Sequence, residues 1–364
     1  MEKRMNILAF ESSCDETSAA VVSREGDRFT VKSNIVASQI DTHRLYGGVV
    51  PEIASRAHIE AISSITYEAM KEADVTMDDI DAVAVTANPG LIGALLVGVN
   101  FAKALAVANN KPLLAVDHIK GHIATCYLDK DGDVPTPPFI ALTVSGGHTG
   151  IYLVESYNKI KLVGSTRDDA IGESFDKIGR IIGIPYPAGK GFDALSKEGF
   201  DEIVGECDDY LQKYKKSAEY KSGEFTLPSP AVKDDTLDFS FSGLKTAAIN
   251  LLHRYEQLGL ELPRARFAAR YTFEAVEAVA KKMGMAIDAY GVKEIALCGG
   301  VAANSHLRHR LATLAKDKNV KLYTPPVSLC GDNGAMIAVS GCFEYLAGRR
   351  ADTSLNASAL DGEM

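Results

Sequence analysis

The feature that most constrains the fold of this chain is a pattern that occurs twice. The stretch FIALTVSGGHTGIYLV overlays the opening NILAFESSCDETSAAVV at a constant offset, which places Ser145 on Ser13. Later, EIALCGGVAANSHLRHRLATLA repeats the strand, glycine turn and helix that AVAVTANPGLIGALLVGVNFAKALA predicts. Two matched pairs in the same order indicate an internal duplication. We therefore expect an α/β fold of two duplicated lobes around a central cleft.

Length supports the same division, because 364 residues are too many for one compact core. We expect residues 1–117, together with about 331–350, to form an N-terminal lobe. Residues 118–330 would form a C-terminal lobe. Within it, the Lys- and Glu-rich stretch at about 201–225 is expected to be a solvated helical connector.

Charge and cysteine usage bound the partners and the compartment. Lys and Arg number 39 against 48 Asp and Glu, a net charge of −9, so the surface as a whole is not a nucleic-acid binder. Local basic segments remain, RARFAAR and RHRLATLAKDK among them. Six scattered cysteines without a CxxC pair indicate reduced thiols. The uncharged run 82–102 contains Asn88-Pro89-Gly90, which would break a spanning helix. We expect a cytoplasmic protein with no membrane contact.

Two histidines in AVDHIKGHIATCYL have the spacing of metal ligands. His118 and His122 are four residues apart, so they share one face of a helix and can bind one ion. In zinc proteases of the H-E-x-x-H kind a glutamate base follows the first histidine, but here Ile119 follows it. Asp332 in SLCGDNGAMIA is a candidate third ligand, and equally a candidate N-cap of the apolar helix that follows. Such nitrogen and oxygen donors suit iron, zinc or magnesium.

Two glycine turns could bind a phosphate group. In TVSGGHTG, Ser145, Gly146 and Gly147 lie between hydrophobic strands, where successive N–H groups can form an anion-binding nest or simply a hairpin turn. ALCGGVAAN supplies a second glycine turn after a strand, and the helix that follows it could face a ligand. Asn304 at its end could contact a polar ligand edge or cap that helix.

A third candidate region is RDDAIGESFDKIGRIIGI, which has the pattern of an amphipathic helix. Its buried stripe is predicted to comprise Ile171, Phe175, Ile178 and Ile182. A second face carries Asp169, Glu173 and Asp176, which are either solvated or, with the nearby YPAGKGFD loop ending in Asp193, hold ribose hydroxyls.

Together these motifs resemble one family, the tRNA adenosine threonylcarbamoyltransferases, or TsaD family. The matching motifs, in family order over nearly the whole chain, are ESSCDET, YGGVVPEIASRAHIE, NPGLIGALLVG, HIKGH, TVSGGHT, GESFDKIGR, DFSFSGLKTA, CGGVAAN and GDNGAMIA. The resemblance implies the actin-like, sugar-kinase and Hsp70-type ATPase fold. It also implies transfer of a threonylcarbamoyl group from threonylcarbamoyl-adenylate to N6 of adenosine 37, in tRNAs that read codons beginning with A.

The resemblance also implies roles for residues. His118, His122 and Asp332 would bind a divalent ion, with Fe²⁺ favoured and zinc or magnesium as alternatives. The adenylate would be bound by Thr143, Val144, Ser145, Gly146, Gly147, Asp176, Gly189, Asp193 and Asn304. No catalytic side chain is identified; the metal site and the serine–glycine turn are expected to polarise the donor. The family loop Tyr-Pro-Gly-Gly-Pro is YPAGKG here, with Ala188 and Lys190 replacing the usual residues.

The motif set resembles the bacterial form, which works with tRNA, an inactive paralogue (TsaB) and an ATPase (TsaE). Because this chain is acidic, we expect part of the tRNA contact to come from such partners. Three other functions remain as alternatives: a metalloprotease, a kinase or nucleotide-binding scaffold of the same fold, and a non-catalytic paralogue. The last is disfavoured because both metal histidines are present.

Overall fold

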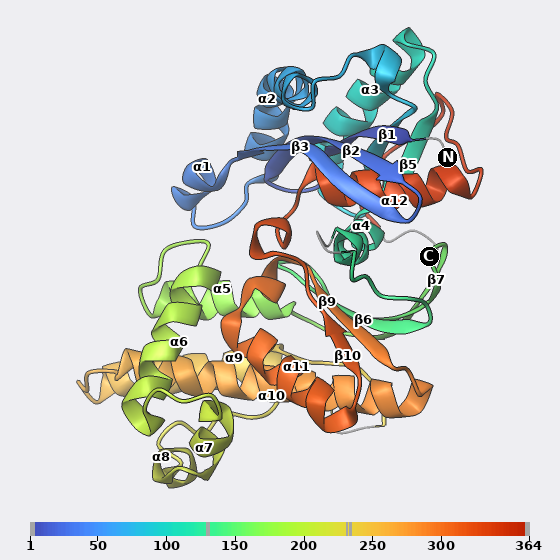
Figure 1. Ribbon diagram of the computed structural model, residues 1–364. Coiled ribbons are helices and arrows are strands. Elements are labelled where there is room, and N and C mark those ends of the chain that lie inside the picture. The colour runs from blue at the N-terminus through green and yellow to red at the C-terminus, as the bar shows by residue number, and fades with distance from the viewer. Residues whose placement is uncertain (1–3, 129–131, 231, 233–234, 361–364) are drawn as a thin grey trace.

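The chain forms two lobes, each built on a five-stranded sheet (Figure 1). The computed structural model describes residues 4–128, 132–230, 232 and 235–360. The first sheet contains β1 (Met5–Glu11), β2 (Glu16–Glu25), β3 (Arg28–Ser38), β4 (Ala82–Asn88) and β5 (Leu113–Asp117). The second contains β6 (Phe139–Val144), β7 (Thr149–Ser156), β8 (Lys159–Ser165), β9 (Glu294–Cys298) and β10 (Lys321–Tyr323).

Helices and short 3-10 turns connect and cover these strands. In the first half of the chain they are α1 (Ile40–Arg44), α2 (Pro51–Glu72), η1 (Met77–Asp79), α3 (Ile92–Ala108), α4 (His118–Ala124) and η2 (Thr125–Tyr127). In the second half they are α5 (Ile171–Ile181), α6 (Gly189–Val204), α7 (Tyr210–Lys216), α8 (Ala218–Ser222), α9 (Ser242–Gln257), α10 (Arg264–Tyr290), η3 (Gly300–Ala303), α11 (Ser305–Lys318), η4 (Val327–Leu329) and α12 (Gly334–Leu346).

Strand pairing confirms the duplication. The order of the first sheet is β3-β2-β1-β4-β5, and that of the second, in the corresponding direction, is β8-β7-β6-β9-β10. In each sheet the first strand pairs antiparallel with the second and parallel with the fourth, β1 with β2 and β4, β6 with β7 and β9. The matched sequence stretches therefore occupy equivalent places, which gives the two-lobed, actin-like α/β fold that the sequence predicts.

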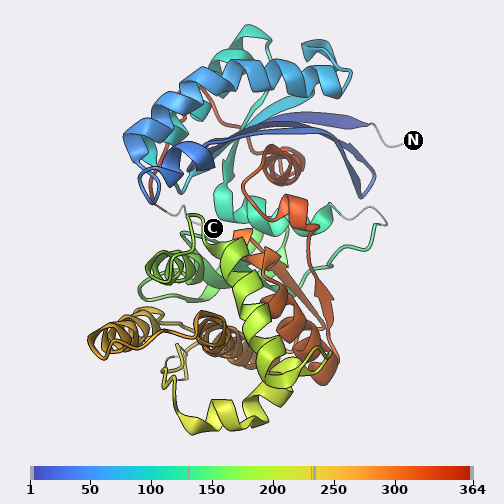
Figure 2. The ribbon, with the colours of Figure 1, turned by 90° about the vertical axis from the view of Figure 1, so that its left-hand side faces the viewer.

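The first sheet is covered on both faces. Helices α2 and α3 lie along its outer face and α12 lies along the face toward the second lobe (Figure 2). The uncharged run 82–102 is divided between β4 and the start of α3, as its internal proline and glycine predict. Among the described residues, no helix combines the length and the apolar character that crossing a membrane requires.

Between the lobes, α4 and α12 pack against one another and against strands of both sheets. Ile119 and Ile123 of α4 belong to the same buried cluster as Met336 of α12 and Phe139 of β6. A Cβ atom at Gly121 would lie 2.7 Å from Ile337 Cδ1, so the two helices meet at a glycine. Because α4 contacts both sides, the lobe boundary at residues 117 and 118 stays a prediction.

In the second lobe, helices cover the far face of the second sheet, and the buried stripe predicted for α5 is confirmed: Ile171, Phe175, Ile178 and Ile182 are all buried. The stretch 201–225 is more than the solvated connector that its charges suggested. Leu211 and Tyr214 of α7 are buried against Phe200 of α6 and Phe273 of α10. This segment therefore adds a small apolar core of its own to the lobe.

Candidate metal centre and donor pocket

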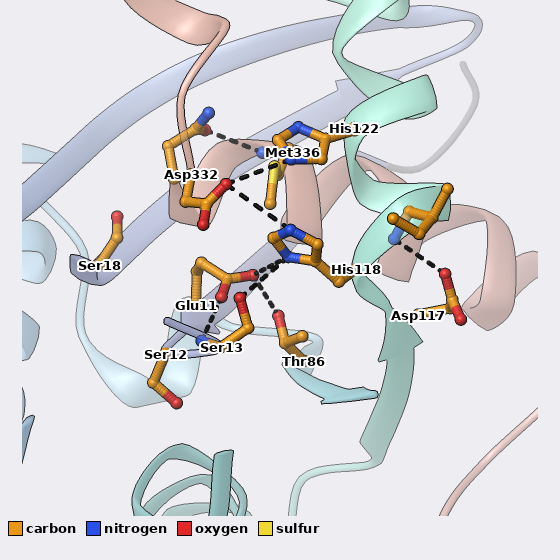
Figure 3. Close-up of polar contacts among 12 residues, drawn as sticks. Glu11, Ser12, Ser13, Ser18, Thr86, Asp117, His118, His122, Asp332 and Met336 are labelled. Carbon is orange, nitrogen blue, oxygen red and sulfur yellow. Dashed lines mark hydrogen bonds and ion pairs between the residues drawn. The ribbon is translucent and has the colours of Figure 1, made fainter. Parts of the chain in front are cut away.

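Three side chains from two distant parts of the sequence meet between the lobes. His118 and His122 lie one turn apart on α4, and Asp332 lies in the loop before α12 (Figure 3). Asp332 Oδ1 is 3.2 Å from His122 Nε2 and 3.6 Å from His118 Nε2. One ligand atom from each of the three falls within 4.8 Å of the others. The structure thus brings together the three residues that the sequence singles out, and metal binding by them stays a prediction.

Local caps fix the direction of these side chains. Asp117 ends β5 and caps α4 by accepting hydrogen bonds from the N–H groups of Ile119 and Lys120, so the helix begins at His118. At the other ligand, Asn333 is the N-cap of α12 and accepts from Met336 N–H. The alternative in which Asp332 caps this helix is wrong, because its neighbour takes that role and Asp332 faces the histidines.

Glu11 supports His118 from behind. The Nδ1 atom of His118 lies 3.1 Å from both Glu11 Oε2 and Ser13 Oγ. Glu11 is itself held by Ser13 N–H at 2.5 Å and by the Thr86 hydroxyl at 2.6 Å. A carboxylate on one ring nitrogen fixes the tautomer and leaves the other nitrogen for a metal, as carboxylates that hydrogen-bond metal-binding histidines do in metalloproteins. Here that other nitrogen is Nε2, which faces Asp332 (Figure 3).

The charges of this cluster influence one another strongly. Burial disfavours the imidazolium of His118, yet the carboxylates of Asp332 and Glu11 outweigh it and raise its pKa to about 9. Burial likewise raises the pKa of Asp332, but the nearby His118 and His122 reverse this and lower it below its usual range. The pKa of Glu11 is also lowered, since His118 overcomes its desolvation. Without an ion, a proton held on His118 offsets one of the two negative charges of Asp332 and Glu11.

His122 tests whether this donor set fits a metal. The residue is fully buried, and neither of its ring nitrogens makes a well-formed hydrogen bond to any residue that the structure describes. Buried imidazole nitrogens are otherwise hydrogen-bonded, because leaving one unpaired is costly. An ion bound between His118, His122 and Asp332 would satisfy the nitrogen that faces Asp332, so the residues present fit a divalent metal.

The serine–glycine turn lies between β6 and β7, as the sequence predicts. Ser145 N–H donates to His148 O at 2.8 Å, and His148 N–H donates to Ser145 Oγ at 3.1 Å, which closes the turn. A Cβ atom at Gly146 or Gly147 would meet no described atom within 4 Å. The side chains of Thr143 and Val144 are buried, so those residues could meet a ligand only through backbone atoms.

The other four residues expected to bind the adenylate lie on neighbouring elements of the second lobe. Asp176 on α5 accepts from Ala188 N–H at 2.7 Å and so holds the start of α6, where Gly189 lies. Asn304 caps α11 by accepting from Leu307 N–H at 2.8 Å. Asp193 on α6 accepts from the N–H and the hydroxyl of Ser305, next to Asn304. The structure thus brings these residues together in two pairs, and ligand binding by them stays a prediction.

Sequence reasoning missed the residues of the first hairpin turn. Glu11 lies in the ESSCDET motif, and a carboxylate at the end of a buried strand was the signal for it. Glu16, from the same motif, is largely desolvated and near Asp332 and Asp15, which raises its pKa to about 10. His148 of the glycine turn also faces the site, with its ring centroid 6.4 Å from that of His118.

Comparison with known proteins gives one family. Residues 30–339 match the family model described as TsaD: tRNA N6-adenosine threonylcarbamoyltransferase. A protein of that name from Clostridium botulinum (strain 657 / Type Ba4) is 47% identical over 358 residues, 98% of this chain and 97% of the relative. Another, from Bacillus anthracis, is 45% identical over 359 residues, covering 98% and 96% of the two chains.

Among solved structures, the crystal structure of T. kodakarensis HypF matches with a TM-score of 0.59 at 13% sequence identity. The match covers 98% of this chain and 49% of that one. A second structure, full-length HypF in the phosphate- and nucleotide-bound form, has a TM-score of 0.50 at 15% identity, covering 94% and 46%. At such identity the likeness shows the fold alone.

Proposed function

The chain belongs to the TsaD family, the tRNA N6-adenosine threonylcarbamoyltransferases, and from this premise we propose how its two lobes divide the work. The enzyme forms N6-threonylcarbamoyladenosine at adenosine 37 of tRNAs that read codons beginning with A. The adenine N6 bonds to the carbamoyl carbon of threonylcarbamoyl-adenylate. The bond from that carbon to the phosphate oxygen breaks, AMP leaves, and N6 loses a proton.

The first lobe and α4 are proposed to hold one divalent ion through His118, His122 and Asp332. The observation that carries this proposal is the buried, unsatisfied His122 beside an ionised Asp332. Two imidazoles and one carboxylate favour iron or zinc over magnesium, which prefers oxygen ligands. We favour Fe²⁺. When bound, the ion would supply Lewis acidity toward the donor's oxygen atoms.

The second lobe is proposed to bind the adenylate through the backbone of Thr143 to Gly147. Because Ser145 N–H is used within the turn, the N–H groups of Gly146 and Gly147 would meet the phosphate. Donors fixed in place in this way can stabilise the charge that develops on the leaving phosphate.

Asp176, Gly189, Asp193 and Asn304 would complete the pocket. Asn304 uses Oδ1 as a cap, which leaves its Nδ2 group to donate to the adenylate. Asp193 accepts from Ser305 through Oδ1, so Oδ2 would accept a ribose hydroxyl. Asp176, whose pKa burial raises, would hold the loop around Gly189 against the nucleoside.

The arrangement does not support a metalloprotease. Such an enzyme needs a base beside the metal-bound water, and α4 offers Ile119 and Lys120 where that glutamate would be. Glu11 contacts Nδ1 of His118 and the Ser13 N–H, not the Nε2 side that faces Asp332. Group transfer requires no water-activating base, so the transferase needs no glutamate at that position.

We propose that the partners are tRNA, the adenylate donor, an inactive paralogue (TsaB) and an ATPase (TsaE), in the cytoplasm. A shallow apolar groove between α2 and α3 supports a protein partner on the outer face of the first lobe. The groove is lined by Ile59, Ile62, Ser63, Leu96, Val97, Asn100 and Phe101. Exposed Ile59 and Tyr67 extend the apolar surface along α2.

The test is reconstitution on an unmodified tRNA transcript with the purified partners, ATP and threonylcarbamoyl-adenylate supplied as the donor. We expect N6-threonylcarbamoyladenosine in the digested tRNA by mass spectrometry, and its loss with His118→Ala. His253→Ala, an exposed histidine on α9, is the matched control and should retain activity. Absence of product from the unsubstituted chain would contradict the function. Cleavage of a glycoprotein would favour the protease, and phosphate transfer from ATP would favour a kinase.

A further inference from the structure

The segment between β3 and α2, residues 39–50, connects the two lobes at the loop that holds Tyr186 and Ala188. Arg44 at the end of α1 donates through Nε to the backbone oxygen of Tyr186, at 3.2 Å. In the opposite direction, Arg180 at the end of α5 donates through a terminal guanidinium nitrogen to Gly47 O, at 3.3 Å. Each lobe therefore contributes one arginine to a carbonyl group of the other. Figure 1 shows α1 on the same side of the molecule as α5.

The backbone of this segment is held from within. His43 is fully buried, lies 3.1 Å from Gln39 Oε1 through Nε2, and accepts from Val50 N–H at 3.3 Å. Turn hydrogen bonds connect Tyr46 N–H and Gly48 N–H to His43 O. A segment fixed in this way loses little conformational entropy when it binds something, so its surface is preorganised.

This rigid segment nevertheless holds two large apolar side chains in solvent. Leu45 is 83% exposed and Tyr46 is 58% exposed. Beside them, the side chain of Arg44 remains 52% exposed despite its contacts with Tyr186 and Asp41. Arg180 is also exposed. We call Arg44, Leu45, Tyr46 and Arg180 the seam surface. Large apolar side chains that a rigid segment holds exposed to solvent point to a binding role.

The seam surface adjoins the reaction site. Gln39 N–H, at the start of the segment, donates to the backbone oxygen of Asp15 in the first hairpin turn, at 3.1 Å. On the other side, Tyr186 begins the loop whose Ala188 N–H binds Asp176. The phenol of Tyr186 is half-buried, and that burial together with the charges of Asp15 and Asp176 raises its pKa. The loop that begins at Tyr186 therefore lies between Arg44 and Asp15 of the first hairpin turn.

We propose that the seam surface contacts the unpaired nucleotides beside adenosine 37, with one base stacked on the ring of Tyr46. This inference rests on the proposed function, which requires that the target adenine enter from a single-stranded loop. Proteins recognise such loops by stacking bases on aromatic rings and by pairing arginines with the backbone. On a chain with a net charge of −9, two exposed arginines flanking an exposed tyrosine form a local site for RNA.

The experiment separates the two substrates. In the reconstituted system, with threonylcarbamoyl-adenylate as the donor, KM and kcat are measured for an unmodified tRNA transcript and for the donor. We expect Tyr46→Ala to raise the KM for tRNA about tenfold, the size of one lost base stack, and to leave the KM for the donor unchanged. Tyr46→Phe keeps the ring and should restore the normal value. Tyr290→Ala, an exposed tyrosine at the end of α10, is the matched control.

Salt gives a second readout. With Arg180→Gln, the slope of log KM for tRNA against log salt should flatten by about one released ion. An unchanged KM for tRNA in Tyr46→Ala, or an equal loss in Tyr46→Phe, would overturn the proposal while product formation still supports the function. Weaker assembly with the partner proteins, measured by gel filtration of Tyr46→Ala, would assign the surface to a protein and would also overturn it.

Discussion

The two lobes share one strand order but place different chemistry at the turn of their first hairpin. In the first lobe the first hairpin carries carboxylates, and Glu11, the last residue of β1, is buried against His118. The position equivalent to Glu11 in the second lobe is Thr143, whose hydroxyl lies 3.3 Å from the thiol of Cys298. There the turn continues as Ser145-Gly146-Gly147, with no acid among those three residues. The first repeat contributes a charged side chain to its turn, and the second contributes backbone N–H groups.

Both repeats keep a glycine whose backbone lies close against the backbone of the hairpin turn. A Cβ atom at Gly90, just after β4, would lie 2.6 Å from Ser13 O. A Cβ atom at Gly299, just after β9, would lie 2.3 Å from Val144 O, and Gly299 has a φ of +91°. Each hairpin turn therefore rests on a glycine that nothing larger can replace. The duplicated backbone is a common support, and functional difference resides in the few residues on the open side of each turn.

The largest effect should follow from removing a metal ligand on the charged side of this comparison. Asp332→Asn keeps the shape of the side chain but removes the charge that faces both histidines. We expect metal content to be lost and transfer to fall more than about a hundredfold, beyond the usual effect of changing a residue that only orients a ligand. Metal analysis of the purified protein and product formation measure this. Asp352→Asn, near the C-terminus and exposed, is the control, and full metal content in Asp332→Asn would refute the site.

Glu11→Gln asks whether the first turn acts through His118. The amide can still contact Nδ1, but it no longer favours the tautomer that leaves Nε2 for an ion. Metal affinity should fall about 10- to 100-fold, as for other carboxylates that hydrogen-bond a metal-binding histidine. Thr143→Val, the equivalent position in the second lobe, should leave metal affinity unchanged because its hydroxyl contacts Cys298. Equal losses at the two positions would show that both lobes support the metal, against the division proposed here.

Two glycine variants test whether the backbone of the Ser145–Gly147 turn binds the adenylate. Gly147→Ala adds a methyl group where no described atom lies within 4 Å, so thermal stability should be kept. If the adenylate approaches that backbone, the methyl group should still reduce transfer about tenfold by displacing the donor. Gly299→Ala should instead destabilise the fold by about 2–3 kcal/mol, since it forces a strained φ and a clash with Val144 O. Melting temperature and the KM for the donor distinguish the two, and normal transfer by Gly147→Ala would argue against donor binding at this turn.

Much of this could be predicted from the sequence because the evidence is periodic or local. The repeat predicted two sheets of one topology, and a four-residue histidine spacing predicted a shared face of α4. The ambiguity at Asp332 was genuine, because Asp332 and Asn333 are adjacent and either can cap a helix. Only packing of the preceding loop decides which one faces His122.

Other features depend on contacts that local sequence does not encode. Glu11 and His118 are 107 residues apart, and they meet because β1 and β5 flank β4 in one sheet. The stretch 201–225 was misread because charged residues surround Leu211 and Tyr214, which share one helix face three residues apart. Their burial depends on Phe273, which lies on α10 far along the chain.

The change expected within a single pH unit, at most about tenfold, is a pH dependence of metal affinity that belongs to the charged lobe alone. In the metal-free protein the pKa of His118 is raised from 6.5 to about 9 by Asp332 and Glu11, so a proton occupies this residue at neutral pH. An ion must displace that proton, so metal affinity should rise with pH by at most about tenfold per unit until pH reaches about 9, and level off above it. Titration calorimetry with zinc between pH 6.5 and 9, in buffers of different ionisation enthalpy, should show the released proton. Glu11→Gln removes one of the two carboxylates that raise the pKa of His118, so the metal affinity of this variant should level off at lower pH. A flat profile in the unsubstituted chain would mean that His118 is already neutral. Glu11 would then orient the ring without favouring its protonation.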